Sequence, residues 1–253
     1  MTRIKRLIPV VALSALMLTS GCTKEQLIQG PSGDAMPATI AANESMARSL
    51  NFSDRKDFEE AKRGLIARPG GKILAEDGAV LIDFDHFKFI AGDAPPTVNP
   101  SLWRHATLNA EYGLFKVTDG IYQLRGFDIA NMTLIEGKTG WIIVDTLTCR
   151  EVAAYALAFA RKYIGEKPVS AIIFTHSHID HFGGVMGIIS PQEVAERQLP
   201  VIAPEYFMEE SISENILVGI AMARRSTYQF GKDLERSVRG VVDGGMGKEA
   251  TYG

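Results

Sequence analysis

The sequence predicts an α/β fold built around a sheet, and three features of its middle part carry this prediction. Two pairs of short apolar segments are separated by hairpin signals, Asp119-Gly120 and residues 137–140. An alanine-rich helical pattern follows over residues 151–164. Residues 169–175 then form a continuous apolar run, which is typical of a strand buried on both faces. Strands that alternate with a helix in this way favour a layered α/β domain.

The remaining elements are predicted from shorter patterns. Residues 41–66 and 205–230 have helical patterns, and an apolar helix-like stretch follows Gly183-Gly184. Residues 93–100 are expected to form a loop, because three prolines fix its backbone. The expected strands are residues 73–74, 80–82, 114–118, 121–125, 132–136, 141–145 and 201–203.

The first 21 residues are predicted to be an export signal. Three basic residues within the first six precede an apolar run over residues 7–18, which is too short to span a bilayer comfortably. The Ser-Gly-Cys ending resembles a bacterial lipobox, so Cys22 is the candidate lipidation site, although Thr19 stands where leucine is usual. We expect an exported protein, in the periplasm or anchored to the outer membrane of a bacterium. A plain cleaved signal and an uncleaved anchor are the alternatives.

Composition limits the remaining function classes. The chain has 253 residues and a formal net charge of −3 without a long run of one sign, which disfavours nucleic-acid binding. Its only two cysteines, Cys22 and Cys149, provide neither a disulfide framework nor a cysteine cluster for zinc. Cys149 follows an apolar strand and is expected to be a buried, inert thiol. Residues 22–76 are expected to form a tether and an N-terminal helical segment.

Four potential metal ligands lie within six residues: His176, His178, Asp180 and His181. Zinc favours imidazole nitrogen and carboxylate oxygen as ligands. Alternate residues at the end of a strand point the same way, so His176 and His178 can share one metal ion. Asp180 and His181, just past the turn, can reach a second metal ion, and two such ions can hold a hydroxide and a substrate together. The sequence therefore predicts a dinuclear metal site.

The alternative is a surface tract that binds metal adventitiously. The tract directly follows the buried-type strand of residues 169–175, and ligand sites prefer the C-terminal ends of strands. Gly183 and Gly184 come after it and permit a close approach of the backbone. This context favours a built site. His86 and His105 lack such neighbours and are expected to be ordinary partly buried or surface residues.

Residues 175–185 resemble the His-x-His-x-Asp-His signature of the metallo-β-lactamase superfamily. Within that superfamily, longer stretches resemble the alkylsulfatases, the zinc-dependent sulfatases that hydrolyse detergents such as dodecyl sulfate. These stretches are residues 87–93, 97–104, 113–123, 125–137 and 203–215. The histidine motif is common to the superfamily, whereas the flanking stretches point to the alkylsulfatases. The resemblance covers roughly residues 80–250.

The resemblance implies a metallo-β-lactamase-like αββα sandwich, with residues 77–253 as the N-terminal part of its catalytic domain. It assigns His176 and His178 to a first zinc ion, and Asp180 and His181 to a second, with Asp180 also the candidate catalytic residue. The family uses further acidic residues and a further histidine downstream, and no histidine follows His181 here. We therefore expect a sandwich truncated before its second half and an incomplete site. The family also implies a homodimer in its full-length members.

A complete site would hydrolyse an alkyl sulfate ester to an alcohol and inorganic sulfate. Metals and cationic side chains would neutralise the sulfate oxygens, and an apolar channel would hold the alkyl tail. The loop around Asn131-Met132 is either the mouth of the site or a structural turn. Arg224 and Arg225 either attract sulfate or form a solvated helix face. The competing hypotheses are another hydrolase of this fold, acting on a lactam, lactone or thioester, and an inactive exported metal-binding fragment.

Overall fold

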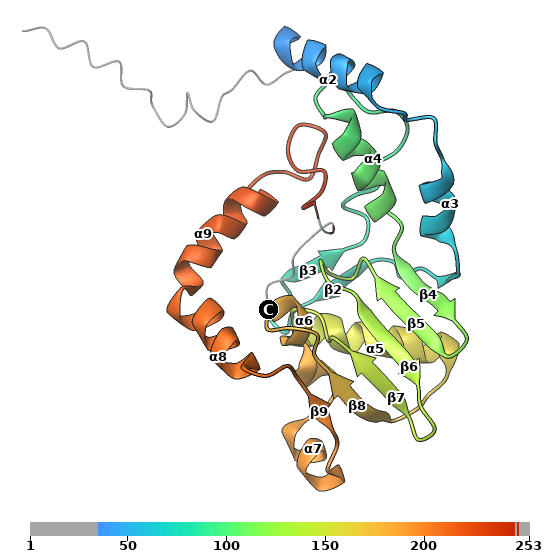
Figure 1. Cartoon of the computed structure of the whole chain (residues 1–253), viewed down its shortest axis with the longest axis vertical. Helices are drawn as coiled ribbons and strands as arrows, with labels where there is room; N and C mark the ends of the chain where they lie inside the picture. The colour runs from blue at the N-terminus through green and yellow to red at the C-terminus, as the bar shows by residue number, and fades with distance from the viewer. Residues whose placement is uncertain (1–34, 246, 248–253) are drawn as a thin grey trace, which may run out of the picture. The chain divides into compact units, whose positions relative to one another are not determined.

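The computed structural model describes residues 35–245 and residue 247, which belong to one compact unit (Figure 1). The predicted export signal and the candidate lipidation residue Cys22 lie outside the described residues. Within the described part of the chain, no helix has both the length and the apolar character needed to cross a bilayer.

A seven-stranded mixed sheet forms the centre of this unit, in the order β1-β4-β5-β6-β7-β8-β9. Neighbours from β1 to β7 pair antiparallel, whereas β7, β8 and β9 pair parallel. The strands are β1 (Leu65–Ala67), β4 (Gly113–Thr118), β5 (Ile121–Arg125), β6 (Met132–Glu136), β7 (Trp141–Val144), β8 (Val169–Ile173) and β9 (Val201–Ile202). The crossover from β7 to β8 is α5 (Arg150–Ile164), so both strands end at the same edge of the sheet.

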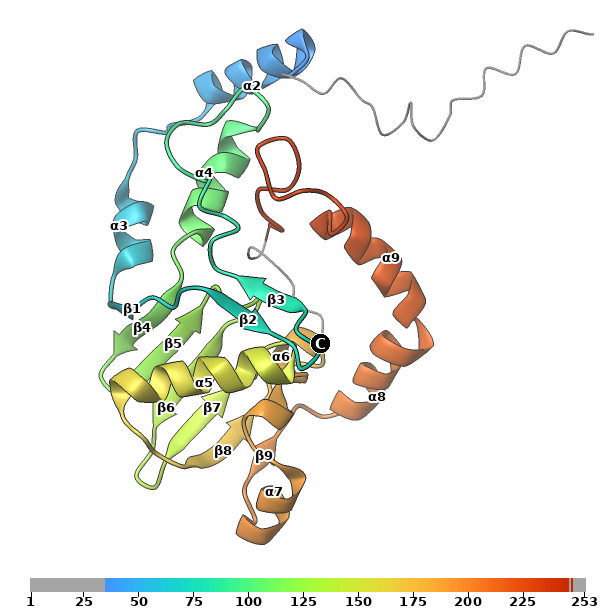
Figure 2. The same ribbon diagram turned by 180° about the vertical axis from the view of Figure 1, so that it is seen from behind.

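Helix α5 covers one face of the sheet, as Figure 2 shows. Along β6 and β7 every second side chain is fully buried on this face, because side chains alternate between the faces of a strand. Small residues of α5, such as Ala153 and Ala156, are also fully buried and let the helix lie close to the strands. The hairpin of β2 (Lys72–Leu74) and β3 (Val80–Asp83) adds Ile73 and Ile82 to the same core.

The opposite face of the sheet carries aliphatic side chains that are only half-buried, including Ile135, Ile142 and Val144. Among residues 35–245 and 247, the only other sheet is the β2–β3 hairpin beside α5, so no second large sheet covers this face. The described chain thus contains one helix layer and one sheet layer of the expected αββα sandwich.

The helix predicted over residues 41–66 is wrong as one element. The structure has α2 (Pro37–Ser49), α3 (Lys56–Lys62) and then strand β1. An Asx turn separates the two helices, in which Asn51 Oδ1 accepts from the backbone N–H of Ser53 at 3.1 Å. Leu65 pairs with Phe115 of β4, so distant sheet pairing overrides its local helical pattern. Helix α4 (Pro100–Asn109), which the sequence pattern did not indicate, begins at Asn99, whose side chain accepts from Ser101 N–H.

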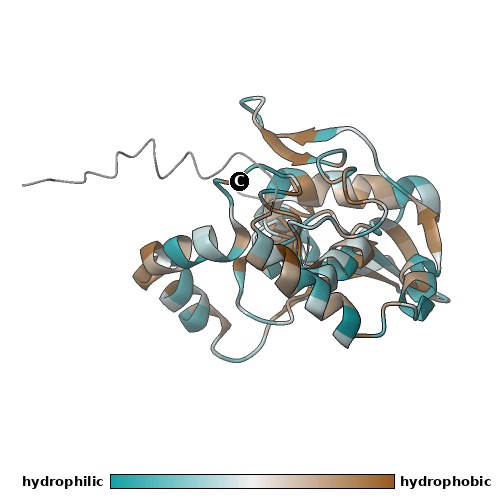
Figure 3. Ribbon diagram, turned by 90° about the horizontal axis from the view of Figure 1, so that it is seen from above, coloured by the Kyte–Doolittle hydropathy of each residue, from teal (hydrophilic) through white to brown (hydrophobic). Residues whose placement is uncertain are grey.

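The long helix predicted over residues 205–230 is also interrupted. It consists of α8 (Phe207–Ile212), the π-helix η2 (Ser213–Leu217) and α9 (Gly219–Phe230). We call residues 207–230 the helical arm, because Figures 1 and 2 show it extending away from the sheet. Ile216, Leu217 and Ile220 are 72%, 75% and 76% exposed, and Figure 3 shows the apolar segments of this arm.

Candidate metal centre

The histidine motif lies beyond the C-terminal ends of β7 and β8. Strand β8 is followed by the loop of residues 174–178 and the one-turn helix α6 (Ile179–Phe182). The backbone N–H of Asp145, directly after β7, donates to the carbonyl of Ile173 at the end of β8. The short helix η1 (Val185–Gly187) and α7 (Pro191–Arg197) then lead to β9. The parallel pairing of β7 and β8 therefore brings the two loops together.

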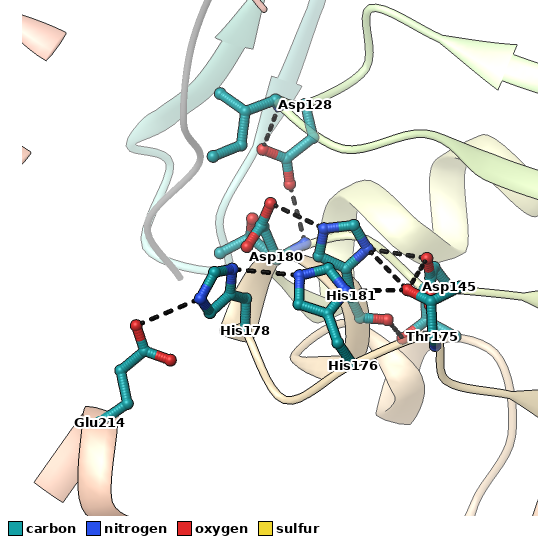
Figure 4. Close-up of polar contacts among 11 residues, drawn as sticks. Asp128, Asp145, Thr175, His176, His178, Asp180, His181 and Glu214 are labelled. Carbon is teal, nitrogen blue, oxygen red and sulfur yellow. Dashed lines mark hydrogen bonds and ion pairs between the residues drawn. The ribbon is translucent and has the colours of Figure 1, made fainter. Parts of the chain in front are cut away.

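All four predicted ligands gather at this edge (Figure 4). His176 Nε2 lies 3.0 Å from His178 Nδ1, and His181 Nε2 lies 3.2 Å from Asp180 Oδ2. The ring centroids of His176 and His181 are 4.0 Å apart, so the two pairs adjoin each other. The side chains face one another instead of spreading into solvent.

The spacing within each pair fits a shared metal ion. Two ligands bound tetrahedrally to zinc at about 2.0–2.1 Å lie roughly 3.3 Å from each other. The nitrogen pair of His176 and His178 and the nitrogen–oxygen pair of His181 and Asp180 are both close to this value. No group of three or more His, Cys, Asp or Glu side chains in the described chain has a geometry that holds one metal ion. The described residues thus offer two pairs of ligands and no completed coordination shell.

Asp145 supports the motif from the neighbouring loop, and the sequence prediction missed its role. Its carboxylate is 8% exposed and accepts from the backbone N–H of Thr175 (2.8 Å), the Thr175 hydroxyl (2.8 Å) and His181 Nδ1 (2.7 Å). Its φ of 59° is in the left-handed region, which Asp and Asn adopt more readily than most residues. A carboxylate at the end of a buried strand is the signal that indicated such a role.

The acceptors around two imidazoles assign their protons. A carboxylate can only accept, so His181 carries its hydrogen on Nδ1 toward Asp145 and directs Nε2 toward Asp180. The hydroxyl of Thr175 donates to Asp145 and therefore accepts from His176 Nδ1, at 3.0 Å. His176 then presents the lone pair of Nε2 to the inside of the cluster. Outer contacts of this kind fix the orientation of metal-binding histidines.

The electrostatics of the cluster separate its members. Burial lowers the pKa of His181, but hydrogen bonds from its ring to Asp145 and Asp180 outweigh this effect and raise the pKa to about 9. Burial and the neighbouring charges of His181 and His178 lower the pKa of His176. Burial raises the pKa of Asp180, and its contact with His181 lowers it to a net value below the ordinary one. A metal ion at His181 would replace a proton that is otherwise strongly held.

Two glycines allow the motif to pack against the loop after β7. A Cβ atom on Gly184 would lie 2.1 Å from the Thr146 carbonyl oxygen and 2.7 Å from the Ala153 Cβ. A Cβ atom on Gly183 would lie 2.2 Å from the Thr148 carbonyl oxygen. These contacts confirm the expected close backbone approach.

Gly184→Ala is therefore expected to destabilise the fold by about 1–3 kcal/mol, because the new methyl group must push backbone atoms apart. Urea unfolding followed by circular dichroism measures this loss. Gly70→Ala is the matched control, since a Cβ atom there meets nothing within 4 Å. Equal unfolding midpoints for the two variants would contradict the close approach.

The other predicted residues lie where the sequence placed them, with one exception. His86 contacts Asp83 (3.6 Å) and His105 contacts the carbonyl of Gly245 (3.0 Å), so their described contacts are outside the histidine motif. Cys149 is buried, as predicted. Met132 is fully buried in the core and cannot line the mouth of a site, whereas Asn131 lines a cavity of about 170 Å³.

Comparison with known proteins identifies the family. The sequence model of the metallo-beta-lactamase superfamily matches residues 125–252, which is half of the chain and includes the histidine motif. The chain belongs to the metallo-beta-lactamase superfamily. This metallo-beta-lactamase chain is also similar to the stereoselective inverting sec-alkylsulfatase Pisa1 from Pseudomonas sp., a solved structure. The TM-score is 0.84 and the identity 46%, over 87% of this chain and 35% of the other.

Curated relatives agree with this similarity. The chain is 49% identical to an alkyl/aryl-sulfatase of Saccharomyces cerevisiae, over 87% of this chain and 34% of the relative. It is 45% identical to an (R)-specific secondary-alkylsulfatase of Pseudomonas sp., over 91% of this chain and 35% of the relative. The chain thus spans about a third of the length of these relatives. These matches confirm the predicted resemblance to the alkylsulfatases and the predicted fold class.

Proposed function

We propose that this chain carries part of the zinc site of an enzyme that hydrolyses alkyl sulfate esters to an alcohol and inorganic sulfate. The observation that carries the proposal is the similarity of 45–49% identity to two alkylsulfatases, over nearly the whole of this chain. A similarity of this extent favours the alkyl sulfate class over other substrates of the superfamily. The gathering of the histidine motif at one sheet edge supports metal-assisted hydrolysis.

The proposed ligands are the two pairs described above. His176 and His178 would hold one zinc ion, and Asp180 and His181 a second, with Asp145 and Thr175 fixing the outer nitrogens of two of the rings. When bound, zinc supplies a water of lowered pKa and positive charge for the sulfate oxygens. Each pair provides two of the four ligands that zinc ordinarily takes. We therefore expect the site to be incomplete in this chain and its zinc binding to be weak.

The helical arm offers a surface for the alkyl tail. Ile212 and Ile216 are 43% and 72% exposed, and both lie within two residues of Glu214, which contacts His178. Burying a methylene group of the tail against such side chains is worth about 0.8 kcal/mol. Arg224 and Arg225 are exposed on α9 of the same arm, which agrees with a solvated helix face.

Zinc titration and product analysis on the 253-residue chain test this proposal. We expect weak zinc binding and a slow release of sulfate from dodecyl sulfate that disappears in a His176→Ala/Asp180→Ala double variant. The double variant excludes a contaminating sulfatase, since its core is unchanged. Rapid turnover, or tight loading with two zinc ions, would contradict an incomplete site.

A substrate panel separates the alternatives. Zinc-dependent hydrolysis of a lactam, lactone or thioester without sulfate release would favour another hydrolase of this fold. Stoichiometric zinc binding without turnover of any ester would favour an inactive metal-binding protein. Neither alternative has the support that the alkylsulfatase relatives give to sulfate esters.

The predicted location and assembly belong to the same proposal. We propose that residues 1–21 direct export, that Cys22 is acylated, that residues 22–76 form a tether and helical segment ahead of the catalytic part, and that the full-length enzyme is a homodimer. Labelling of cells with a fatty acid should mark the wild-type chain and not Cys22→Ser. An unlabelled wild-type chain in the soluble exported fraction would exclude the lipid anchor.

A further inference from the structure

The three imidazoles of the histidine motif share one arrangement: an inner nitrogen faces the cluster and an outer nitrogen faces an oxygen atom. The outer nitrogens of His176 and His181 face Thr175 and Asp145. The outer nitrogen of His178, Nε2, lies 3.4 Å from Oε1 of Glu214 on the helical arm (Figure 4). We propose that Glu214 is the positioning residue for His178. This inference rests on the proposed zinc site.

The arm is attached to the histidine motif at its base. The ring of Phe207, the first residue of α8, stacks on Phe174 with centroids 5.4 Å apart and meets Phe182 edge-on at 5.2 Å. These two aromatic residues stand immediately before and after the motif segment. The Ser211 hydroxyl is buried and lies 3.5 Å from the carbonyl oxygen of Ser177, between the two histidines of the first pair. The base of the arm thus moves with the loop that carries His178.

The π-helix gives Glu214 its direction. A π-helix is rare, and it commonly appears as a single turn at functional sites. Here η2 comprises Ser213–Leu217 and carries Glu214 on the turn nearest the motif. Asn215 stabilises this turn, because its side-chain amide donates to the carbonyl of Ser211 at 2.9 Å. The wider turn changes the phase between α8 and α9 and presents Glu214 to His178.

Glu214 has no competing cation in the described chain. Within residues 35–245 and 247, His178 is the one basic group within ion-pair distance of its carboxylate. The Glu214 side chain is 25% exposed, compared with 57% for the ring of His178. A carboxylate this well covered, with one nitrogen in front of it, restricts the rotation of an otherwise exposed imidazole.

The contact also determines which nitrogen of His178 faces the cluster. A hydrogen on Nε2 directed at the carboxylate leaves a lone pair on Nδ1, 3.0 Å from Nε2 of His176. The lone pair of His176 already points inward, because its other nitrogen donates to Thr175. Two lone pairs at this distance repel each other unless a cation binds both. Glu214 therefore prepares the first pair for a metal ion, and the loss of such outer partners weakens metal affinity by about 10- to 100-fold.

Glu214→Ala and Glu214→Gln test the proposal, with Glu209→Gln as the matched control. Glu209 is an exposed carboxylate on α8 of the same arm, with no ion pair in the described chain. Zinc affinity, measured by competition with a chelating dye, should fall by about 10-fold or more in Glu214→Ala. It should fall less in Glu214→Gln, whose amide oxygen still accepts from Nε2, and should be unchanged in Glu209→Gln. Thermal unfolding of the metal-free chain should be alike in all three variants.

Nitrogen NMR of the metal-free chain gives a second measurement that does not depend on zinc. The signals of His178 should report a hydrogen on Nε2 in the wild type and a mixture of tautomers in Glu214→Ala. Unchanged tautomers together with unchanged zinc affinity would overturn the role of Glu214. Failure of the wild-type chain to bind zinc at all would overturn the proposed function, while the NMR comparison would still decide whether Glu214 orients His178.

Discussion

Asp145→Ala is expected to lower the free energy of unfolding by about 3 kcal/mol and to weaken zinc binding by about 10- to 100-fold. The substitution leaves three donors without their acceptor: the backbone N–H of Thr175, the hydroxyl of Thr175 and Nδ1 of His181. It also places alanine at a φ of 59°, which a side chain without a polar group adopts less readily. Both effects act on the loop that joins β7 to the histidine motif.

Urea unfolding and zinc titration measure the two effects, and Asp145→Asn separates them. Asparagine tolerates the left-handed backbone and keeps one acceptor oxygen, but it cannot accept from all three donors. We expect its stability to fall less than that of the alanine variant, while its zinc affinity still falls. If Asp145→Ala unfolded at the same urea concentration as the wild type, the carboxylate would not support the site as described.

The second large effect concerns the two ligand pairs. His176→Ala and Asp180→Ala should each reduce the number of zinc ions bound at saturation, and the double variant should bind none at the motif. The reason is that each substitution removes one member of a pair whose atoms lie 3.0 or 3.2 Å apart. A single remaining protein ligand has little affinity for zinc, which ordinarily takes four.

Equilibrium dialysis with metal analysis counts the zinc, and thermal unfolding supplies an independent readout. A ligand that binds only the folded state at 100 times its dissociation constant stabilises that state by about 2.7 kcal/mol. Saturating zinc should therefore raise the melting temperature of the wild type and leave that of the double variant unchanged. His86→Ala is the control, because this histidine contacts Asp83 away from the motif. Zinc binding by the double variant at the wild-type level would refute the assignment of these residues.

The sequence predicted the centre of the fold because its signals are local. Strands β4 to β7 alternate between buried and half-buried side chains, and their hairpin turns lie between them in the chain. The continuous apolar run of β8 and the alanine pattern of α5 were equally readable. The predictions failed where distant contacts decide. Leu65 is in a strand because Phe115 lies beside it, and the arm changes helix type where it contacts the histidine loop.

For the candidate site, the sequence by itself determined the four residues of the histidine motif and the strand end that presents them. Spacing within six residues is a local property, so it can be read directly from the chain. Only the tertiary structure decided which oxygens face the outer nitrogens. Asp145 is 36 residues from His181, and Glu214 comes from a helix far along the chain. The parallel pairing of β7 with β8 and the anchoring of the arm at Phe207 bring them to the motif, and neither contact leaves a periodic pattern in the sequence.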